Sequence, residues 1–248
     1  MLGYILSKMQ MLLFAAGIFL VGILFLGFIS GLELKTTADN LLLNTSSGVI
    51  SVLSSKEGLC YSKSLSIPDR LSFGFNGSDQ VFYDLNISWV TIGDKNELIL
   101  SINEHGKKNI ISARKVSMQE QIILIDPGFL AEDSALTNYY DKKQITLYPR
   151  AANKGPQASA PNSFVMVKEV QGGKGTIYII PCTTLREETP KNCIRNVLRV
   201  GCYKLAATNP SESDSISQCF DITRELSGSG TQVSGMTWAQ CKSEGYYN

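Results

Sequence analysis

The chain begins with a hydrophobic segment that contains no charged residue over residues 11–29. In a helix, roughly 20 such residues span the hydrocarbon core of a bilayer, which is about 30 Å thick. The apolar core of a cleavable signal peptide is shorter, about 7–15 residues, and ends at a small-x-small site that is missing here. We therefore predict a transmembrane helix that remains as an anchor, uncleaved or trimmed only at its N-terminus, with membrane lipid around it.

Beyond this span, apolar residues continue at helical spacing, and no proline occurs before Pro68. The pattern predicts one long helix over residues 10–54, whose lower half faces lipid and whose amphipathic upper half forms a stem. Gly27 and Gly31 lie four residues apart at the outer end of the span, a spacing that allows close helix packing in lipid. The candidate helix-packing residues are Gly27, Gly31, Leu34, Leu41, Val49 and Val52.

After Gly58 the hydrophobic pattern changes its period from 3.6 to 2 residues. Alternate residues from Val81 to Trp89 are apolar, which is typical of a strand with one buried face. Turns separate further predicted strands over residues 97–103, 109–116, 121–125 and 144–148. A predicted hairpin joins residues 164–170 to residues 176–181. Short strands of this kind indicate an antiparallel sheet or sandwich.

The last third of the chain combines a loop, short helices and most of the cysteines. Residues 149–163 are rich in Pro, Ala, Ser and Gly and predict an exposed loop or linker. Thr189 and Pro190 predict the start of a helix to about residue 205, followed by a short helix over residues 215–226 and a final segment over residues 238–245. The even number of cysteines and the absence of C-x-x-C spacing favour disulfides over metal sites, with the pairing left open; the candidates are Cys60, Cys182, Cys193, Cys202, Cys219 and Cys241.

Together these elements predict an α+β protein. A long N-terminal transmembrane and stem helix precedes an antiparallel β-sheet or sandwich head and a disulfide-rich C-terminal region with short helices. The predicted divisions are an N-terminal tip and transmembrane helix (residues 1–31), a stem (32–55), a β-rich head (56–148), a linker (149–163) and a hairpin with the cysteine-rich region (164–248).

Charges near the span predict its orientation. Lys8 precedes the span, and Glu33, Lys35 and Asp39 follow it, so the positive-inside rule, on this small difference in charge, places the N-terminus inside and the C-terminal bulk outside the cytoplasm. Three N-x-[ST] triplets agree with that location, because such sites accept glycans in secreted segments. The glycosylation candidates are Asn44, Asn76 and Asn86.

The overall charge argues against nucleic acid as a partner. Lys and Arg number 23 and Asp and Glu number 22, a formal net charge of +1, whereas a phosphate backbone attracts a basic surface.

Three patterns resemble reactive sites, and each has a simpler structural interpretation. His105, the only histidine, lies in a polar turn without a nucleophile motif. The loop Gly172–Gly175 precedes a strand rather than a helix, which favours a hairpin turn over a phosphate-binding loop. The acidic residues after the fourth predicted strand (residues 121–125) do not follow EF-hand spacing, which favours a solvated loop over a calcium site; they are Asp126, Glu132, Asp133 and Asp141. We predict no catalytic residue, cofactor or metal.

A hydrophobic N-terminal helix that continues as an amphipathic stem into a β-rich, disulfide-bonded head resembles the type IV pilin family, particularly archaeal pilin-like proteins. The resemblance covers about the first 125 residues. It implies a filament subunit that assembles through residues 11–29 and the apolar stripe of residues 34–53. The sequence departs from the family at the processing site, where Met9 replaces the usual small residue, and at the fifth mature position, where Phe14 replaces an acidic residue.

A second interpretation requires no N-terminal processing. The chain is then a single-pass, membrane-anchored extracytoplasmic binding or scaffolding protein, whose stem serves as a stalk or a docking helix. An extracellular enzyme is a third class, but no catalytic motif in the sequence favours it. We expect the anchored binding protein, with the pilin-like structural subunit as the alternative and with a protein partner or self-association through the N-terminal helix.

Overall fold

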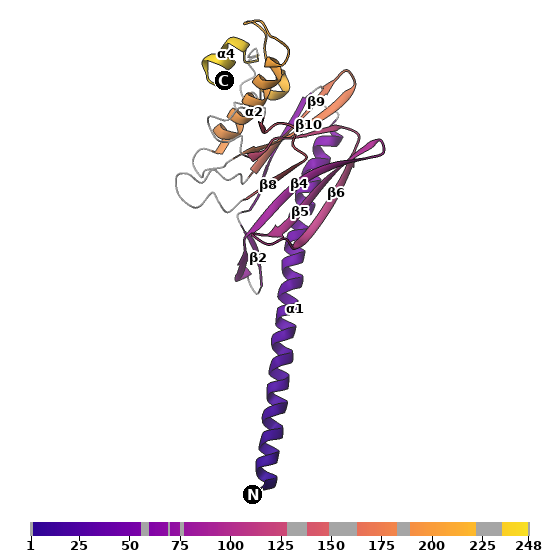
Figure 1. Ribbon diagram of the computed structural model, residues 1–248, viewed down its shortest axis with the longest axis vertical. Helices are drawn as coiled ribbons and strands as arrows, with labels where there is room; N and C mark the ends of the chain where they lie inside the picture. Colours follow the sequence, from indigo (N-terminus) through magenta and orange to yellow (C-terminus); the bar gives the residue numbers. More distant parts are fainter. Residues whose placement is uncertain are drawn as a thin grey trace.

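The computed structural model describes residues 2–55, 60–68, 70–74, 77–127, 138–148, 163–182, 189–221 and 235–247, with side chains except at residues 2–7, 60–62, 64, 66 and 189–193. Helix α1 (Leu2–Ser54) has 53 residues and is about 80 Å long at the standard rise. Its first half projects from the rest of the protein, and its second half lies against the β-strands (Figure 1). We call the projecting half of α1 the rod, its second half the stem, and the part of the protein after α1 the head.

Among the described residues, two four-stranded sheets and one hairpin form the β-structure of the head. The inner sheet contains, in spatial order, β1 (Cys60–Ser66), β9 (Ser163–Gln171), β10 (Lys174–Cys182) and β7 (Gln121–Leu124). The outer sheet is antiparallel throughout and contains, in spatial order, β6 (Ile110–Met118), β5 (Lys95–Glu104), β4 (Tyr83–Ile92) and β8 (Gln144–Leu147). The inner sheet is antiparallel except that β10 and β7 are parallel. Strands β2 (Leu71–Phe73) and β3 (Asp79–Val81) form the hairpin.

The first hydrophobic core lies between the two sheets and α1. Alternate residues of the outer sheet, such as Leu85, Leu100 and Ile102, are fully buried there, as the period of 2 predicts. The inner sheet contributes one of its two faces. The upper half of α1 completes this core with Ala38, Leu42, Val49 and Val52.

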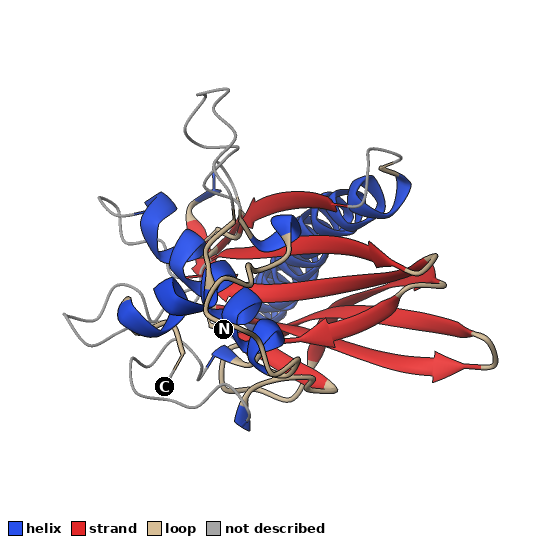
Figure 2. Ribbon diagram, turned by 90° about the horizontal axis from the view of Figure 1, so that it is seen from above, coloured by secondary structure: helices blue, strands red, loops and turns tan. Residues whose placement is uncertain are grey.

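The second core covers the opposite face of the inner sheet. Ile177 and Ile179 of β10 face the first core, whereas Tyr178 and Ile180 face the second. Because both faces of this sheet are buried, β7, β9 and β10 have continuous apolar runs in place of an alternating pattern. The C-terminal helices lie on one side of the sheets (Figure 2) and form the second core together with the inner sheet. They are α2 (Thr189–Ala206), the 3-10 helix η5 (Gln218–Phe220) and α4 (Trp238–Ser243).

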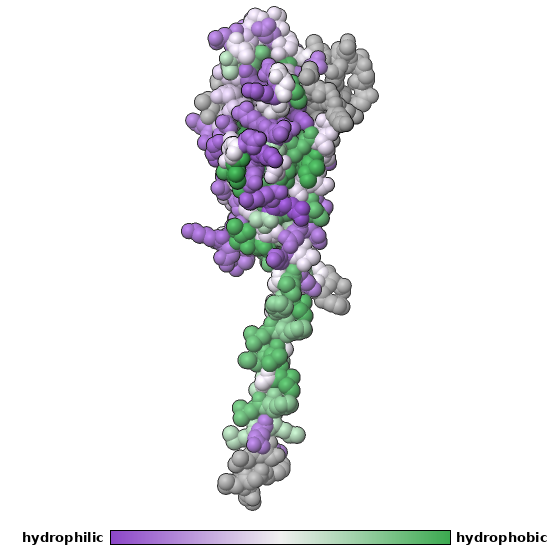
Figure 3. Space-filling model, turned by 90° about the vertical axis from the view of Figure 1, so that its right-hand side faces the viewer, coloured by the Kyte–Doolittle hydropathy of each residue, from purple (hydrophilic) through white to green (hydrophobic). Residues whose placement is uncertain are grey.

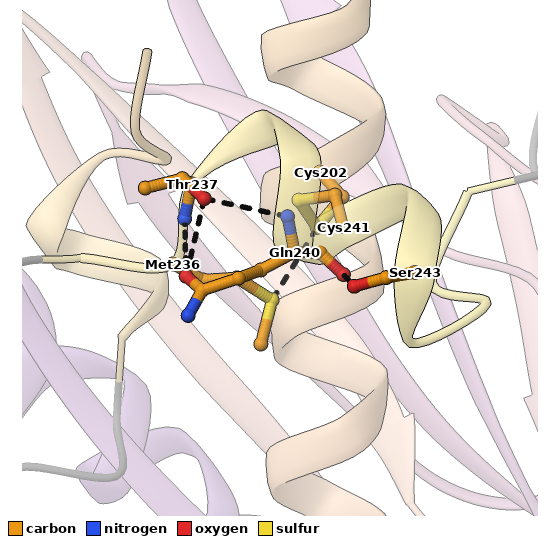
Figure 4. The surroundings of a disulfide bond; sticks show 6 residues. All are labelled: Cys202, Met236, Thr237, Gln240, Cys241 and Ser243. Atoms are coloured by element: carbon orange, nitrogen blue, oxygen red, sulfur yellow. Dashed lines mark hydrogen bonds between the residues drawn. A yellow bond between two sulfur atoms is a disulfide. The ribbon is translucent and has the colours of Figure 1, made fainter. Parts of the chain in front are cut away.

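A disulfide and a capping box hold the last helix in place (Figure 4). Cys202 of α2 is bonded to Cys241 of α4, 39 residues further along the chain. Thr237 Oγ1 accepts a hydrogen bond from the Gln240 backbone N–H at 3.3 Å, and Gln240 Oε1 accepts one from the Thr237 N–H at 2.8 Å. This reciprocal pair satisfies backbone donors at the start of α4. The Met236 Sδ lies 3.9 Å from the Cys202 Sγ.

The predicted α+β class is confirmed, with differences in detail. Helix α1 already begins at Leu2, and the predicted strands and hairpin occur within a few residues of their expected bounds. Strands β1, β2 and β3 were missed because they are short or polar. Of the predicted helix 215–226, only η5 is helical among the described residues, and residues 222–226 lie outside them. Strands from both sides of the predicted 149–163 linker pair in the inner sheet, so the segments 56–148 and 164–248 share this sheet.

We expect the stem to be part of the head's core, and two neighbouring leucines test this. Leu42 is fully buried and Leu43 is 46% exposed. Leu42→Ala leaves a cavity and should lower the free energy of unfolding by about 2–5 kcal/mol. The control Leu43→Ala should change it by less than about 0.5 kcal/mol. Denaturant unfolding of each variant in detergent measures both values, and equal effects would mean that the stem is not packed in the core.

Candidate membrane-spanning helix and its junction with the head

Within the described residues, one helix is long and apolar enough to cross a bilayer, and its most apolar 18-residue window has no buried residue. The large apolar side chains from Met9 to Phe28 are 54–76% exposed. They form the continuous apolar surface of the projecting rod in Figure 3. The 24 residues between Lys8 and Glu33 carry no charge and span about 36 Å, slightly more than the hydrocarbon core of about 30 Å.

Three side chains of α1 join its middle to the lower end of the head. Glu33 Oε2 accepts a hydrogen bond from the Gly74 backbone N–H at 2.7 Å. Thr37 Oγ1 donates to the Ser72 carbonyl at 3.3 Å. Asp39 Oδ1 accepts a hydrogen bond from the Ser112 hydroxyl of β6. These contacts attach both the β2–β3 hairpin and the outer sheet to the helix just above the apolar rod.

The upper end of α1 is held by cations from the inner sheet. Lys168 Nζ donates to the Leu53 carbonyl at 2.6 Å and lies 3.6 Å from Glu120 Oε1. The last carbonyls of a helix have no partner within the helix and carry a partial negative charge. A lysine at this position therefore satisfies a carbonyl and interacts favourably with the helix dipole. Lys63 Nζ adds a hydrogen bond to Ser51 Oγ at 2.9 Å.

The residues proposed for helix packing divide into two groups. Val49 and Val52 are buried in the first core, and Leu34 and Leu41 pack against it. The apolar stripe that the resemblance assigned to assembly is therefore covered by the chain's own head. Gly27 and Gly31 lie on the exposed rod, where an added Cβ would meet no atom within 4 Å.

A different face of the stem remains uncovered. Leu32, Leu43 and Ile50 are 46–51% exposed. They are 11 and 7 residues apart, close to whole numbers of helical turns, so they share one face of α1. This exposed stem face was not recognised from the sequence, because only the structure shows which side of the helix the head covers.

The described cysteines are all in disulfides. Cys202 pairs with Cys241, and Cys182 and Cys219 are also disulfide-bonded. The side chains of Cys60 and Cys193 lie outside the described part of the protein.

The glycosylation candidates differ in their surroundings. Asn44 is exposed on α1. The Asn86 side chain donates to Asn103 Oδ1 at 3.2 Å and accepts from the Thr146 hydroxyl at 2.7 Å. Asn76 lies outside the described residues, and glycosylation at all three stays a prediction.

His105, the histidine considered as a catalytic candidate, forms a pair with an aspartate. His105 Nδ1 lies 2.5 Å from Asp84 Oδ1, a pairing that the sequence did not suggest. A catalytic triad also needs a nucleophile hydrogen-bonded to the other ring nitrogen, and the described residues contain no such hydrogen bond.

Gly172 and Gly173 have positive φ angles of 58° and 80° and form the turn of the predicted β9–β10 hairpin.

The predicted acidic loop is only partly described. Glu132 and Asp133 lie outside the described residues, whereas Asp126 and Asp141 lie within them. In the described part of the chain, no three His, Cys, Asp or Glu side chains gather closely enough to hold a metal ion.

A cluster of tyrosines beside an ion pair joins α2 to the inner sheet, and the sequence did not predict it. Lys204 of α2 pairs with Glu169 of β9, and its Nζ lies 4.7 Å from the centre of the Tyr178 ring. Tyr140 and Tyr203 pack with ring centres 5.2 Å apart. Burial raises the pKa of Tyr140 to about 12 and also raises the pKa of Tyr178. The cluster stabilises the helix–sheet contact.

The contact between Lys168 and the end of α1 predicts a measurable loss of stability. Lys168→Met removes the donor to the Leu53 carbonyl and should lower the free energy of unfolding by about 1–2 kcal/mol. The control is Lys115→Met, which removes a surface ion pair to Glu97 with a lysine side chain 62% exposed and should cost less than about 0.5 kcal/mol. Equal losses in denaturant unfolding would show that Lys168 does not hold the helix end.

The raised pKa of Tyr140 predicts a loss of stability in alkali. The unfolded chain releases the tyrosine proton near pH 10, whereas the folded chain retains it to about pH 12. The stabilisation is therefore complete below about pH 10 and decreases as the pH rises through this window, by at most about 1.4 kcal/mol per pH unit. Tyr140→Phe should make this decrease less steep in denaturant unfolding, and an unchanged slope would contradict the account.

Comparison of the chain with protein-family models, with curated proteins and with solved structures gave no match. The long N-terminal apolar helix followed by an antiparallel sheet is compatible with a pilin-like architecture.

Proposed function

We propose that this protein is a single-pass, membrane-anchored extracytoplasmic binding or scaffolding protein without catalytic activity. The observation that carries the proposal is the division of one unbroken helix into an exposed apolar half and a half buried in the head. An exposed apolar surface of this length is unfavourable in water and favourable in lipid. The buried half fixes the head directly above the membrane, without a flexible linker.

The proposed orientation has two supports. Lys8 lies at the projecting end of α1, and the positive-inside rule favours the cytoplasm for that end. The Cys202–Cys241 disulfide favours an oxidising compartment for the head. Both support a head that lies outside the cytoplasm.

Mass spectrometry on the native cell tests this function. Surface filaments removed by shearing and washed membranes are collected separately, and the N-terminus of the protein is determined in each fraction. A protein confined to membranes that still carries Lys8 agrees with the anchored protein. A protein in the filament fraction that begins at or near Gln10 would instead show pilin-like processing and assembly.

The alternative, a pilin-like structural subunit, has one specific support. Gly27 and Gly31 and the exposed stem face of Leu32, Leu43 and Ile50 are open to contact with a second helix. The apolar side chains of this face are about half exposed in the isolated chain, and burying them between copies would be favourable.

Charge on the exposed stem face distinguishes the two functions. The double variant Leu43→Lys and Ile50→Lys should leave the size of the particle in detergent and in membranes unchanged if the protein is an anchored monomer. If the protein is instead a pilin-like subunit, the double variant should lose assembly, because each copy would bury two lysines in the contact between subunits, which is strongly unfavourable. Asn40→Lys, on another exposed part of the stem, is the control for added charge. Crosslinking followed by gel electrophoresis gives the readout.

A further inference from the structure

The β2–β3 hairpin runs along α1 toward the apolar rod. Ser72 is bonded to Thr37, and Gly74 is bonded to Glu33. Two residues along a strand cover about 7 Å, and four residues along a helix cover about 6 Å. The strand and the helix axis are therefore nearly parallel, and the hairpin descends beside the helix. Figure 1 shows β2 as the lowest part of the head.

The length of the rod places this hairpin at the level of the lipid headgroups. The uncharged residues between Lys8 and Glu33 cover about 36 Å, and the hydrocarbon core takes about 30 Å of it. Each headgroup layer adds roughly 5–7 Å beyond the core. With the core centred on the rod, Glu33, which holds Gly74 at the lower end of the hairpin, lies about 3 Å beyond the core and falls within that layer, whereas Thr37, about 6 Å further along the helix, lies just above it.

A shallow groove of about 380 Å³ separates the hairpin from the helix. Its apolar lining consists of Ile29, Leu32 and Phe73, and its polar lining includes Thr36, Thr37 and Ser72. Along the helix, Ile29 and Leu32 lie on the side of the rod, whereas the threonines lie on the side of the head. The groove is therefore apolar toward the rod and polar toward the head, in the same order as the hydrocarbon core and the headgroup layer of a bilayer.

The polar end of the groove presents mainly acceptors. The Thr36 hydroxyl donates to the Leu32 carbonyl at 2.9 Å, and the single proton of the Thr37 hydroxyl is shared between the Glu33 carbonyl at 3.0 Å and the Ser72 carbonyl at 3.3 Å. Both hydroxyl oxygens are therefore left as acceptors. Glu33 uses one carboxylate oxygen for Gly74. This chemistry fits a headgroup with hydrogen-bond donors, such as an ammonium or hydroxyl group, better than a bare phosphate.

We propose that the β2–β3 hairpin is a second membrane contact, and that its groove with α1 holds the headgroup end of a donor-bearing lipid in the outer leaflet. The inference rests on the proposed membrane anchoring, because the groove continues the apolar surface of the rod. The contact fixes the rotation of the head about the membrane normal, which a single helix alone leaves free.

Three tryptophan variants of the full chain test the proposal. Each is reconstituted in phosphatidylcholine vesicles with bromine atoms near the headgroup end of the acyl chains, and the added fluorescence is compared with that of the unmodified protein. Phe73→Trp reports on the groove. Phe28→Trp reports on the rod, and Ile92→Trp reports on the far end of β4, about 30 Å along the strand from Tyr83.

We expect bromine to quench the tryptophans at positions 73 and 28 and to leave the one at position 92 unchanged. Quenching at 28, with position 73 behaving like position 92, would overturn the hairpin contact and leave the anchor intact. No quenching at 28 would overturn the anchoring itself.

Photo-crosslinking of the unmodified protein gives a test that does not depend on how the variants fold. Lipids with a photoreactive group near the glycerol are expected to label residues 70–74 in addition to the rod. The yield at the groove should be higher with a phosphatidylethanolamine probe, whose ammonium group donates hydrogen bonds, than with a phosphatidylcholine probe. Labels confined to the rod contradict the contact, and equal yields contradict the headgroup preference.

Discussion

The head depends on the burial of the upper half of α1 between the edges of its two sheets. Leu42 and Val52 of the helix are fully buried among side chains of both sheets, so the helix is part of the core and not an attachment to it. Because the same helix continues without interruption into the exposed rod, the orientation of the head is tied to the orientation of the rod. The polar contacts at Glu33 and Lys168 lie near the two ends of this buried segment and fix its position along the axis.

The inner sheet connects this arrangement to the C-terminal region. It shares one face with α1 and the outer sheet, and the other with α2, η5 and α4. Its strands come from three separate parts of the chain, so folding of the first core and of the second core depends on the same sheet. The Lys204–Glu169 pair attaches α2 to that sheet, and the Cys202–Cys241 disulfide attaches α4 to α2.

Periodicity predicted the elements that bury a regular face. The 3.6-residue pattern gave α1 and the alternation from Val81 to Trp89 gave β4, because each element buries one face in a continuous core. Strand β1 was missed because its sequence, CYSKSLS, has little apolar content, and its position depends on pairing with β9, about 100 residues later. Strands β2 and β3 have only three residues each, too few for a period to appear.

The sequence identified the rod but not its surroundings. Gly27, Gly31 and the apolar stem could be recognised from spacing, whereas the side of the stem that the head covers depends on contacts between distant segments. The same holds for the hairpin groove and for the Asp84–His105 pair, whose members are 21 residues apart. Local patterns contain no information on such contacts, because tertiary packing decides them.

The most direct test of the account is labelling of intact native cells with an amine-reactive reagent that does not cross membranes, followed by mass spectrometry. The head exposes Lys107 and Lys174, whereas Lys8 lies at the far end of the rod. A single-pass anchor with an extracytoplasmic head predicts labels on Lys107 and Lys174 in intact cells, with Lys8 labelled only after permeabilisation. Labelling of Lys8 in intact cells, either alone or to the same extent as the head lysines, would contradict the proposed anchoring and orientation.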